Sequence, residues 1–299
     1  MIRTRICIAS LVALCATAPL FAQQKPIPHF RSEVHLNRLI FGNFFQAAEG
    51  HPEETVTAVT TSYRAIYRPT PKPLDIYGQV EYMNFTGIDR DSAYGGRVGV
   101  TYDGRIHDFE GFIDRGENRV AFDVGNRTAF ANITTVSGEY SYRVAEDWQL
   151  GAEGYHERQR FDVRSDREND YSSLGGSVRY RGWGSIFSPR VGYVVGKRDV
   201  VNNSDSYDDR YWYVQATSSP HPKVYISVRY RGREREYDAI APVTTARVDD
   251  RAQWTAFVGY RIAPHYGTAL YYSREGSRSN FQGETFTTSF LLLGVTLYF

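Results

Sequence analysis

Apolar and polar residues alternate along most of the chain with a period of two. From Val224 to Tyr230 every second residue is apolar, and the residues between them are largely polar. The same pattern recurs from Trp254 to Ile262 and from Leu291 to Phe299. Successive side chains of a β-strand point to opposite faces, so the alternation predicts strands with one apolar and one polar face. We therefore expect an all-β protein.

The connections between these segments alternate between short and long. Short ones occur at 67–69, 142–147, 219–222 and 260–265, and Asp103-Gly104 is a compact turn that typically joins adjacent antiparallel strands. Long ones are polar and charged, as at 164–170, 197–210, 238–250 and 275–283. In an antiparallel arrangement this order places the short turns at one end of the molecule and the long loops at the other.

Three all-β architectures produce alternating strands. A soluble sandwich or lipocalin-like barrel turns its apolar face inwards, and a propeller repeats every ~40 residues with blade signatures, which this sequence lacks. A transmembrane barrel turns its apolar face outwards and has short turns on one side and long loops on the other. The regular short and long connections favour a transmembrane antiparallel up-and-down β-barrel.

Counting backwards from the C-terminus gives fourteen expected strands, an even number as this class requires. The segment 117–125 is left over: it extends a strand, forms a hairpin in an outer loop or, if it spans, raises the count towards sixteen. The first segment could equally form a short helix. The expected strands are 31–45, 55–67, 72–85, 92–103, 105–114, 129–144, 148–163, 171–181, 185–196, 210–218, 223–237, 251–262, 266–275 and 284–299.

Composition narrows the class further. The 299 residues carry a formal net charge of +1, so no basic excess exists to neutralise nucleic-acid phosphates. A mean hydropathy of −0.46 argues against a bundle of membrane helices, whereas a membrane barrel keeps half of each strand polar. The 23 tyrosines and 26 glycines are typical of a β protein.

The first 22 residues have the features of a secretory signal peptide. Arg3 and Arg5 form a basic start, an apolar stretch runs from Ile6 to Ala18, and a cleavage site follows Ala22. The stretch is shorter than the ~20 residues that a first transmembrane helix needs. Both cysteines lie in this leader, so we expect the domain at 23–299 to contain no disulfide.

The C-terminus carries a more specific signal. Apolar residues occupy alternate positions from Leu291 to Phe299. This ending resembles the terminal strand of bacterial outer-membrane barrels, which runs polar, any, glycine, any, any, apolar, any, aromatic. Gly294, Leu297 and Phe299 fit that pattern, whereas Leu292 stands where a polar residue is expected. The resemblance implies an outer-membrane barrel that the barrel assembly machinery recognises through this strand.

A second resemblance concerns the end of the chain. The segment 277–280, followed by Leu293-Gly294-Val295, is similar to β-barrel porins associated with polysaccharide export. That resemblance implies a porin-like protein.

The polar phase of the strands should line the lumen. Acids predominate on the expected strands 3 to 7 and arginines on strands 8 to 12, although Arg64, Arg97 and Arg143 break this division. Two walls of opposite charge would orient polar solutes, but the same charges could instead pair and close the barrel. Eight strands already suffice for a filled interior, so fourteen favour an open one. The expected lumen residues are Asp75, Glu81, Asp108, Glu110, Glu139, Glu153, Glu157, Arg179, Arg181, Arg190, Arg229, Arg231 and Arg261.

Aromatic residues divide between the two phases. Those of the outer phase lie beside the short turns and are expected to form a girdle at the membrane interface: Tyr67, Tyr142, Trp148, Tyr180, Tyr260, Tyr266 and Phe299. Those of the inner phase could instead stack on sugars: Tyr155, Tyr211, Tyr213, Tyr225 and Tyr271.

Signatures of catalysis and of cofactors are absent from the sequence. It has no Gly-x-Ser-x-Gly, no His-Glu-x-x-His and no phosphate-binding glycine loop, and its seven histidines lack metal-ligand spacing. Asp205, Asp208 and Asp209 could bind calcium but more simply belong to a solvated loop. We expect no enzyme, cofactor or metal.

These observations predict an integral outer-membrane barrel that allows passive diffusion of small polar solutes. The alternative is a non-conducting structural barrel, or one associated with polysaccharide export. The expected partners are outer-membrane lipid, the barrel assembly machinery and the solutes, and the sequence does not define the oligomeric state.

Overall fold

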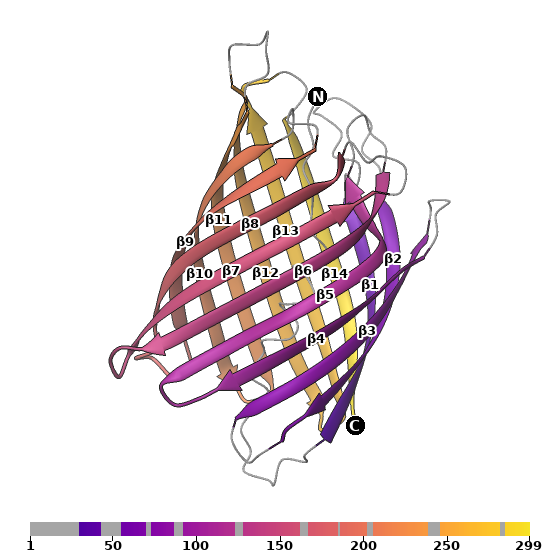
Figure 1. The fold of residues 1–299 in the computed structure, drawn as a ribbon. Helices are drawn as coiled ribbons and strands as arrows, with labels where there is room; N and C mark the ends of the chain where they lie inside the picture. Colours follow the sequence, from indigo (N-terminus) through magenta and orange to yellow (C-terminus); the bar gives the residue numbers. More distant parts are fainter. Residues whose placement is uncertain are drawn as a thin grey trace.

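The protein folds into one closed antiparallel β-barrel of fourteen strands (Figure 1). The computed structural model describes residues 30–42, 55–69, 73–86, 92–122, 128–161, 167–184, 186–201, 206–238, 246–281 and 285–299. The expected leader at 1–22 lies outside the described residues. Each strand pairs with its neighbours in sequence, and β1 pairs with β14. The expected fold class and strand number are confirmed.

The strands are 11 to 16 residues long. They are β1 (Phe30–Gly42), β2 (Val56–Tyr67), β3 (Leu74–Thr86), β4 (Ala93–Asp103), β5 (His107–Phe122), β6 (Thr128–Arg143), β7 (Trp148–Arg160), β8 (Asn169–Tyr180), β9 (Ser188–Val200), β10 (Tyr207–His221), β11 (Val224–Tyr237), β12 (Val248–Ala263), β13 (Tyr266–Ser279) and β14 (Phe286–Tyr298).

Two segments that the sequence left open are resolved by the pairing. The segment at 31–45 forms strand β1, not a helix, and the segment at 117–125 begins as an extension of β5, which ends at Phe122. The long connections are shorter than expected, because β9 continues to Val200, β12 begins at Val248 and β13 continues to Ser279. These strand ends carry charges on both faces, so no apolar alternation marks them.

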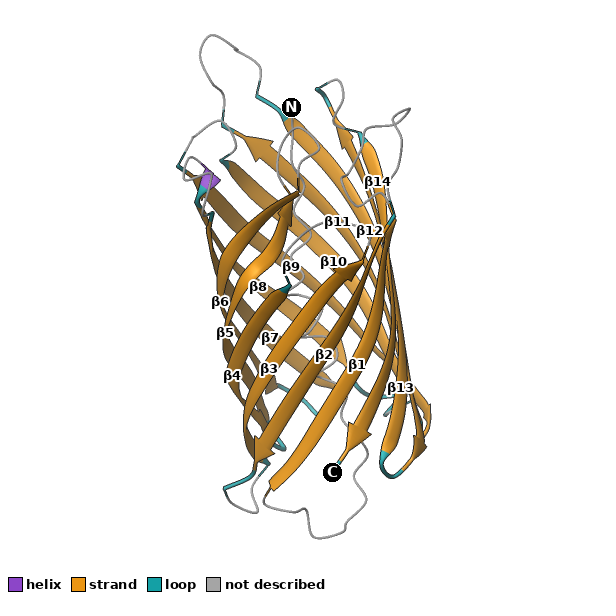
Figure 2. Ribbon diagram, turned by 90° about the vertical axis from the view of Figure 1, so that its right-hand side faces the viewer, coloured by secondary structure: helices purple, strands orange, loops and turns teal. Residues whose placement is uncertain are grey.

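The two ends of the barrel differ in their connections. The described turns after β4, β6, β10 and β12 are short and lie at the end that holds the C-terminus (Figure 2). There the backbone N–H of Phe299 donates to the carbonyl oxygen of Ser32 at 2.9 Å, and the N–H of Ser32 donates to Phe299 at 3.2 Å. These bonds continue the β1–β14 ladder to the last residue, so the terminal strands present no open edge.

The outer face of the barrel is apolar on every strand. Each strand carries at least one aliphatic side chain that is between 38% and 70% exposed. One such residue from each strand, in chain order, is Leu36, Val59, Val80, Val98, Ile113, Val136, Leu150, Leu174, Val191, Val214, Val228, Val258, Leu270 and Leu293.

Two tyrosines of the inner face lie over glycines of the adjacent strand. Tyr213 is directly opposite Gly192, and a Cβ atom added at Gly192 would lie 2.3 Å from the Cζ of Tyr213. Tyr77 is related to Gly99 in the same way, with a separation of 2.4 Å. A side chain at either glycine would displace a ring that is almost fully buried, so these positions require glycine for space.

We expect Gly192→Val to destabilise the barrel by about 1–3 kcal/mol, the usual cost of overpacking a filled site. Unfolding of the refolded barrel in denaturant, followed by tryptophan fluorescence, measures the effect. Gly78→Val is the matched control, because no atom lies within 4 Å of a Cβ added at Gly78. Equal unfolding midpoints for the two variants would contradict this account of Tyr213.

Candidate functional site

Contacts between strands that are not neighbours identify the inner face of the barrel. Arg190 on β9 donates to Glu139 on β6 at 2.6 Å, and the hydroxyl of Tyr213 on β10 donates to Glu153 on β7 at 2.9 Å. Such contacts reach across two intervening strands, which is possible only on the concave side of a closed sheet. The alternate residues that include these side chains therefore form the inner face of the barrel.

Every residue that was expected to line the lumen and that lies on a strand has this inward phase, and one further expected residue lies in a turn. Those on strands occupy β3, β5, β6, β7, β8, β9, β11 and β12, while Arg181 lies in the turn after β8, 3.7 Å from Asp108. Glu157 is fully buried, whereas Arg179, Arg229 and Arg231 are partly exposed. Arg261 lies near the short turns, where it donates to the carbonyl oxygen of Pro264 at 2.7 Å.

Three glutamates form one row across the acidic wall. Glu110 on β5 is directly opposite Glu139 on β6, which is directly opposite Glu153 on β7. Like charges in such a row repel, and two of the three have partners from the arginine side of the barrel, Arg190 and Tyr213. The row therefore depends on contacts that cross the sheet.

The expected division into an acidic and a basic wall is incomplete. On the acidic side, Asp114 pairs with Arg97 at 3.3 Å and with Arg119 at 3.1 Å. Nearer the short turns, Arg68 donates to Asp75 at 2.6 Å, and this hydrogen bond raises the pKa of the Arg68 guanidinium. Cations and acids thus alternate along this wall.

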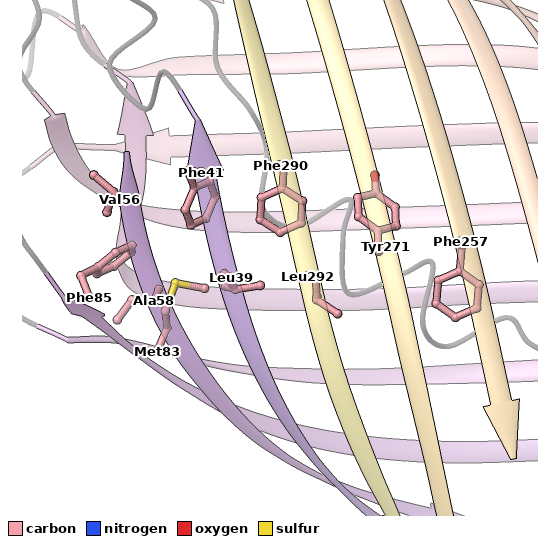
Figure 3. Close-up of a cluster of buried hydrophobic side chains, with 11 residues drawn as sticks. Leu39, Phe41, Val56, Ala58, Met83, Phe85, Phe257, Tyr271, Phe290 and Leu292 are labelled. Atoms are coloured by element: carbon pink, nitrogen blue, oxygen red, sulfur yellow. The ribbon is translucent and has the colours of Figure 1, made fainter. Parts of the chain in front are cut away.

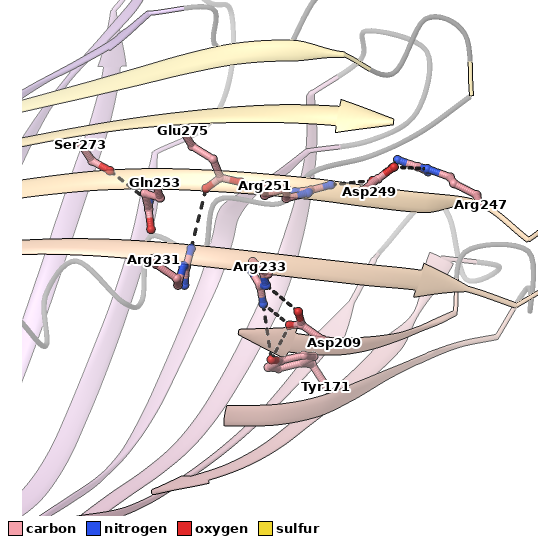
Figure 4. Close-up of polar contacts among 10 residues, drawn as sticks. All are labelled: Tyr171, Asp209, Arg231, Arg233, Arg247, Asp249, Arg251, Gln253, Ser273 and Glu275. Atoms are coloured by element: carbon pink, nitrogen blue, oxygen red, sulfur yellow. Dashed lines mark hydrogen bonds and ion pairs between the residues drawn. The ribbon is translucent and has the colours of Figure 1, made fainter. Parts of the chain in front are cut away.

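The arginine side holds a buried ion-pair network that the sequence interpretation missed (Figure 4). Arg233 donates through Nε to Asp209 at 2.6 Å, and Tyr171 donates to the same carboxylate at 2.8 Å. Arg251 lies 3.1 Å from Asp249 and 3.4 Å from Glu275. Asp209 was expected in a solvated or calcium-binding loop, but it lies in β10 and is 1% exposed.

These residues continue the phase of the predicted lumen positions. On β11, Arg233 and Arg235 follow Arg231 at intervals of two residues. On β12, Arg251 and Asp249 precede Gln253 at the same interval. The signal was therefore the two-residue interval itself, extended past the point where the outer residues cease to be apolar.

Several inward arginines of the described chain have no acidic partner, and Arg179 and Arg229 are two of them. Among the described residues, no carboxylate oxygen lies within 4.0 Å of the guanidinium of Arg179 or of Arg229, whereas Arg190 pairs with Glu139 and Arg231 lies 3.8 Å from Glu275. Arg229 instead lies over the ring of Tyr213, with Cζ 3.9 Å from the ring centroid.

The inner tyrosines proposed for sugar stacking are largely covered. Tyr213 is 1% exposed beneath Arg229, and Tyr271 is buried in an apolar cluster. Tyr155 packs against Tyr171 with ring centroids 5.9 Å apart, and guanidinium groups lie 5.4 Å from the ring of Tyr211. Stacking against arginine and other rings leaves Tyr213 no free face for a sugar.

A buried apolar cluster occupies the inner face from β12 round to β4 (Figure 3). Leu292 belongs to it and lies directly opposite Leu39 of β1 and Tyr271 of β13. This contact explains why Leu292 replaces the polar residue of the outer-membrane pattern. Its described members are Leu39, Phe41, Val56, Ala58, Met83, Phe85, Ala93, Phe257, Tyr271, Phe290 and Leu292.

The residues of the expected assembly signal lie on both faces of β14 and at its end. Gly294 faces inwards, and a Cβ atom there would lie 2.3 Å from Oδ1 of Asn37. Leu297 has the opposite phase, and Phe299 is 70% exposed.

The aromatic residues expected in a girdle gather at the short-turn end. Six of them are outward and exposed: Tyr67, Tyr142, Trp148, Tyr260, Tyr266 and Phe299. The seventh, Tyr180, packs against Trp148 with ring centroids 4.9 Å apart.

Among the described residues, no three or more His, Cys, Asp or Glu side chains form a group that could hold a metal ion. No helix in the described part of the chain is long and apolar enough to cross a membrane.

Solved structures with a similar architecture share little sequence with this chain. A TodX ΔS2S3 mutant, described as a monoaromatic hydrocarbon channel, aligns with a TM-score of 0.53 and 10% identity over 91% of this chain and 90% of its own. An outer-membrane channel from Pseudomonas putida F1 aligns with a TM-score of 0.49 and 11% identity over 92% and 97%. OmpT, an outer-membrane protein of Vibrio cholerae, aligns with a TM-score of 0.47 and 13% identity over 93% of this chain and 100% of its own.

At these identities the likeness shows the fold alone. No family model and no curated protein matches the sequence.

Because Asp209 is buried between Arg233 and Tyr171, we expect Asp209→Asn to destabilise the barrel by about 3–5 kcal/mol, as when one partner of a buried ion pair is removed. Chemical denaturation of the refolded barrel measures the change. The control is Asp199→Asn, which removes the exposed pair with Lys197 and should leave the unfolding midpoint almost unchanged, because solvent screens an exposed ion pair. If both variants lost a similar free energy of unfolding, the Arg233–Asp209 pair would contribute no more to stability than an exposed ion pair.

Proposed function

We propose that this protein is an integral protein of a bacterial outer membrane, exported by the leader at 1–22. The exposed aliphatic side chains on all fourteen strands support this location, because lipid is the solvent that such a surface requires. Outward Arg38, directly opposite Val59 and Leu293, departs from the pattern, and its long side chain can extend its charge to the interface.

Orientation and assembly follow from the same surface. The short turns and the C-terminus lie on the periplasmic side, with the exposed aromatic residues at that interface. Phe299 and Leu297 present the outward half of the terminal strand to the barrel assembly machinery.

We further propose that the barrel is a channel for passive diffusion of small polar solutes. One observation carries this proposal: between described residues, every ion pair joins strands at most three positions apart around the barrel, as from Arg190 to Glu139. The charges therefore lie along the wall. Fourteen strands ~4.8 Å apart and tilted by ~40° form a circle roughly 28 Å across, which wall side chains do not fill.

Single-channel recording in a planar bilayer tests this proposal. The purified barrel, shown to be folded by its heat-modifiable migration on a detergent gel, should give stable open steps in potassium chloride. The same sample after heating should give none. A folded but silent barrel would contradict the channel and favour a non-conducting structural role or one in polysaccharide export.

The assignment of the two faces has its own test on β11. Val228 is 40% exposed on the outer face and Arg229 lies on the inner face. Val228→Arg should impair folding into lipid vesicles by up to about 2–4 kcal/mol, the cost of arginine at the bilayer midplane. Arg229→Ser should fold nearly as the parent does. The reverse result, in which Arg229→Ser fails and Val228→Arg folds, would mean that the faces are exchanged.

A further inference from the structure

One row of the lumen wall carries more positive charge than its acids neutralise. Arg179 on β8 is directly opposite Arg190 on β9, and Gln215 on β10 lies between Arg190 and Arg229 on β11. Within the described part of the chain, Glu139 is the only acid paired to this row, through Arg190 at 2.6 Å. Two guanidinium charges, those of Arg179 and Arg229, remain available to a solute.

The position of Arg229 is fixed by its neighbours. Its guanidinium lies 3.9 Å from the centroid of Tyr213, whose hydroxyl is held by Glu153 at 2.9 Å. The Nε atom of Arg229 is buried and has no hydrogen-bond partner. A guanidinium is a rigid fork of N–H donors that matches the two oxygens of a carboxylate, so this group is suited to bind an organic acid.

A series of aromatic rings begins beside this arginine on the same strand. Tyr225 and Arg229 both face inwards on β11, with only Ser227 between them in that phase. The ring of Tyr225 is 5.8 Å from that of Phe257, which is directly opposite Tyr271.

The series continues on the neighbouring strands. Tyr271 lies 5.7 Å from Phe290, and Phe290 lies 4.9 Å from Phe41. Figure 3 shows Phe257, Tyr271 and Phe290 side by side on successive strands. Tyr225 is partly exposed at the edge of this apolar cluster, so the cluster meets the lumen beside the arginines.

We propose that this part of the wall selects monocarboxylates that carry an aromatic ring. Arg179 and Arg229 attract the carboxylate, and Tyr225, which is partly exposed at the edge of the apolar cluster, contacts the ring. The unneutralised charge excludes an uncharged hydrocarbon as the preferred solute, and the adjacent rings favour an aromatic acid over a small inorganic anion. This inference rests on the channel function proposed above and names its solute class.

The experiment compares benzoate with acetate as probes of the purified barrel in a planar bilayer. Benzoate should reduce the chloride current at a concentration at least tenfold lower than acetate does. Arg179→Gln combined with Arg229→Gln should raise the benzoate concentration required by at least tenfold. Tyr225→Ser should raise it for benzoate and leave the response to acetate unchanged.

The matched control is Arg190→Gln combined with Glu139→Gln. It removes a neutral ion pair from the same row, leaves the net charge of the lumen unchanged and should retain the preference for benzoate. Each variant is first shown to fold by its heat-modifiable migration.

The outcomes separate the two proposals. Open channels that respond equally to benzoate and acetate, or a double arginine variant that responds like the parent, would overturn the inference and leave the channel function intact. A folded but silent barrel would overturn the channel function. Isothermal titration of the detergent-solubilised barrel with benzoate then decides the inference, which fails if no binding that depends on Arg179 and Arg229 is detected.

Discussion

The pairing of β1 with β14 is the contact on which the rest of the structure depends. It joins the two ends of the sheet over ten residue pairs, from Glu33 opposite Tyr298 to Gly42 opposite Ser289. Closure satisfies the backbone groups of both terminal strands and turns a two-residue alternation into an inside and an outside. Because one step of register moves every side chain to the other face, the registers of the closed sheet place Arg229 on the inner face and Val228 on the outer face.

Closure also brings inward side chains close enough to pair across several strands. On a flat sheet, β6 and β9 would be three strand spacings apart, about 14 Å, yet Arg190 reaches Glu139 on the concave face. Long arginines can therefore lie over shorter acids along the wall, and a buried carboxylate such as that of Asp209 gains charge-assisted hydrogen bonds that offset its burial. The network stiffens the wall without requiring any side chain to cross the axis.

The strand count, the antiparallel order and the two faces followed from period-two alternation and from the lengths of the connections. What alternation did not give was the strand ends beyond the apolar band, because Asp208 and Asp209 are both charged although one faces out and the other pairs with Arg233. Partner choice was equally inaccessible. Whether Arg229 pairs with an acid or lies over Tyr213 depends on a register between β10 and β11 that no local pattern encodes.

The apolar cluster inside the barrel lies where β1 meets β14. Among the paired strands, β1 and β14 are the most distant in sequence, so their contact carries the largest loop-closure entropy. Their inner faces lack ion pairs to one another among the described residues and instead join Phe41 to Phe290 and Leu39 to Leu292. Apolar contacts are non-directional and tolerate an imperfect approach, unlike the exact geometry of a buried ion pair. An aromatic and aliphatic inner face therefore suits the seam whose closure costs the most chain entropy.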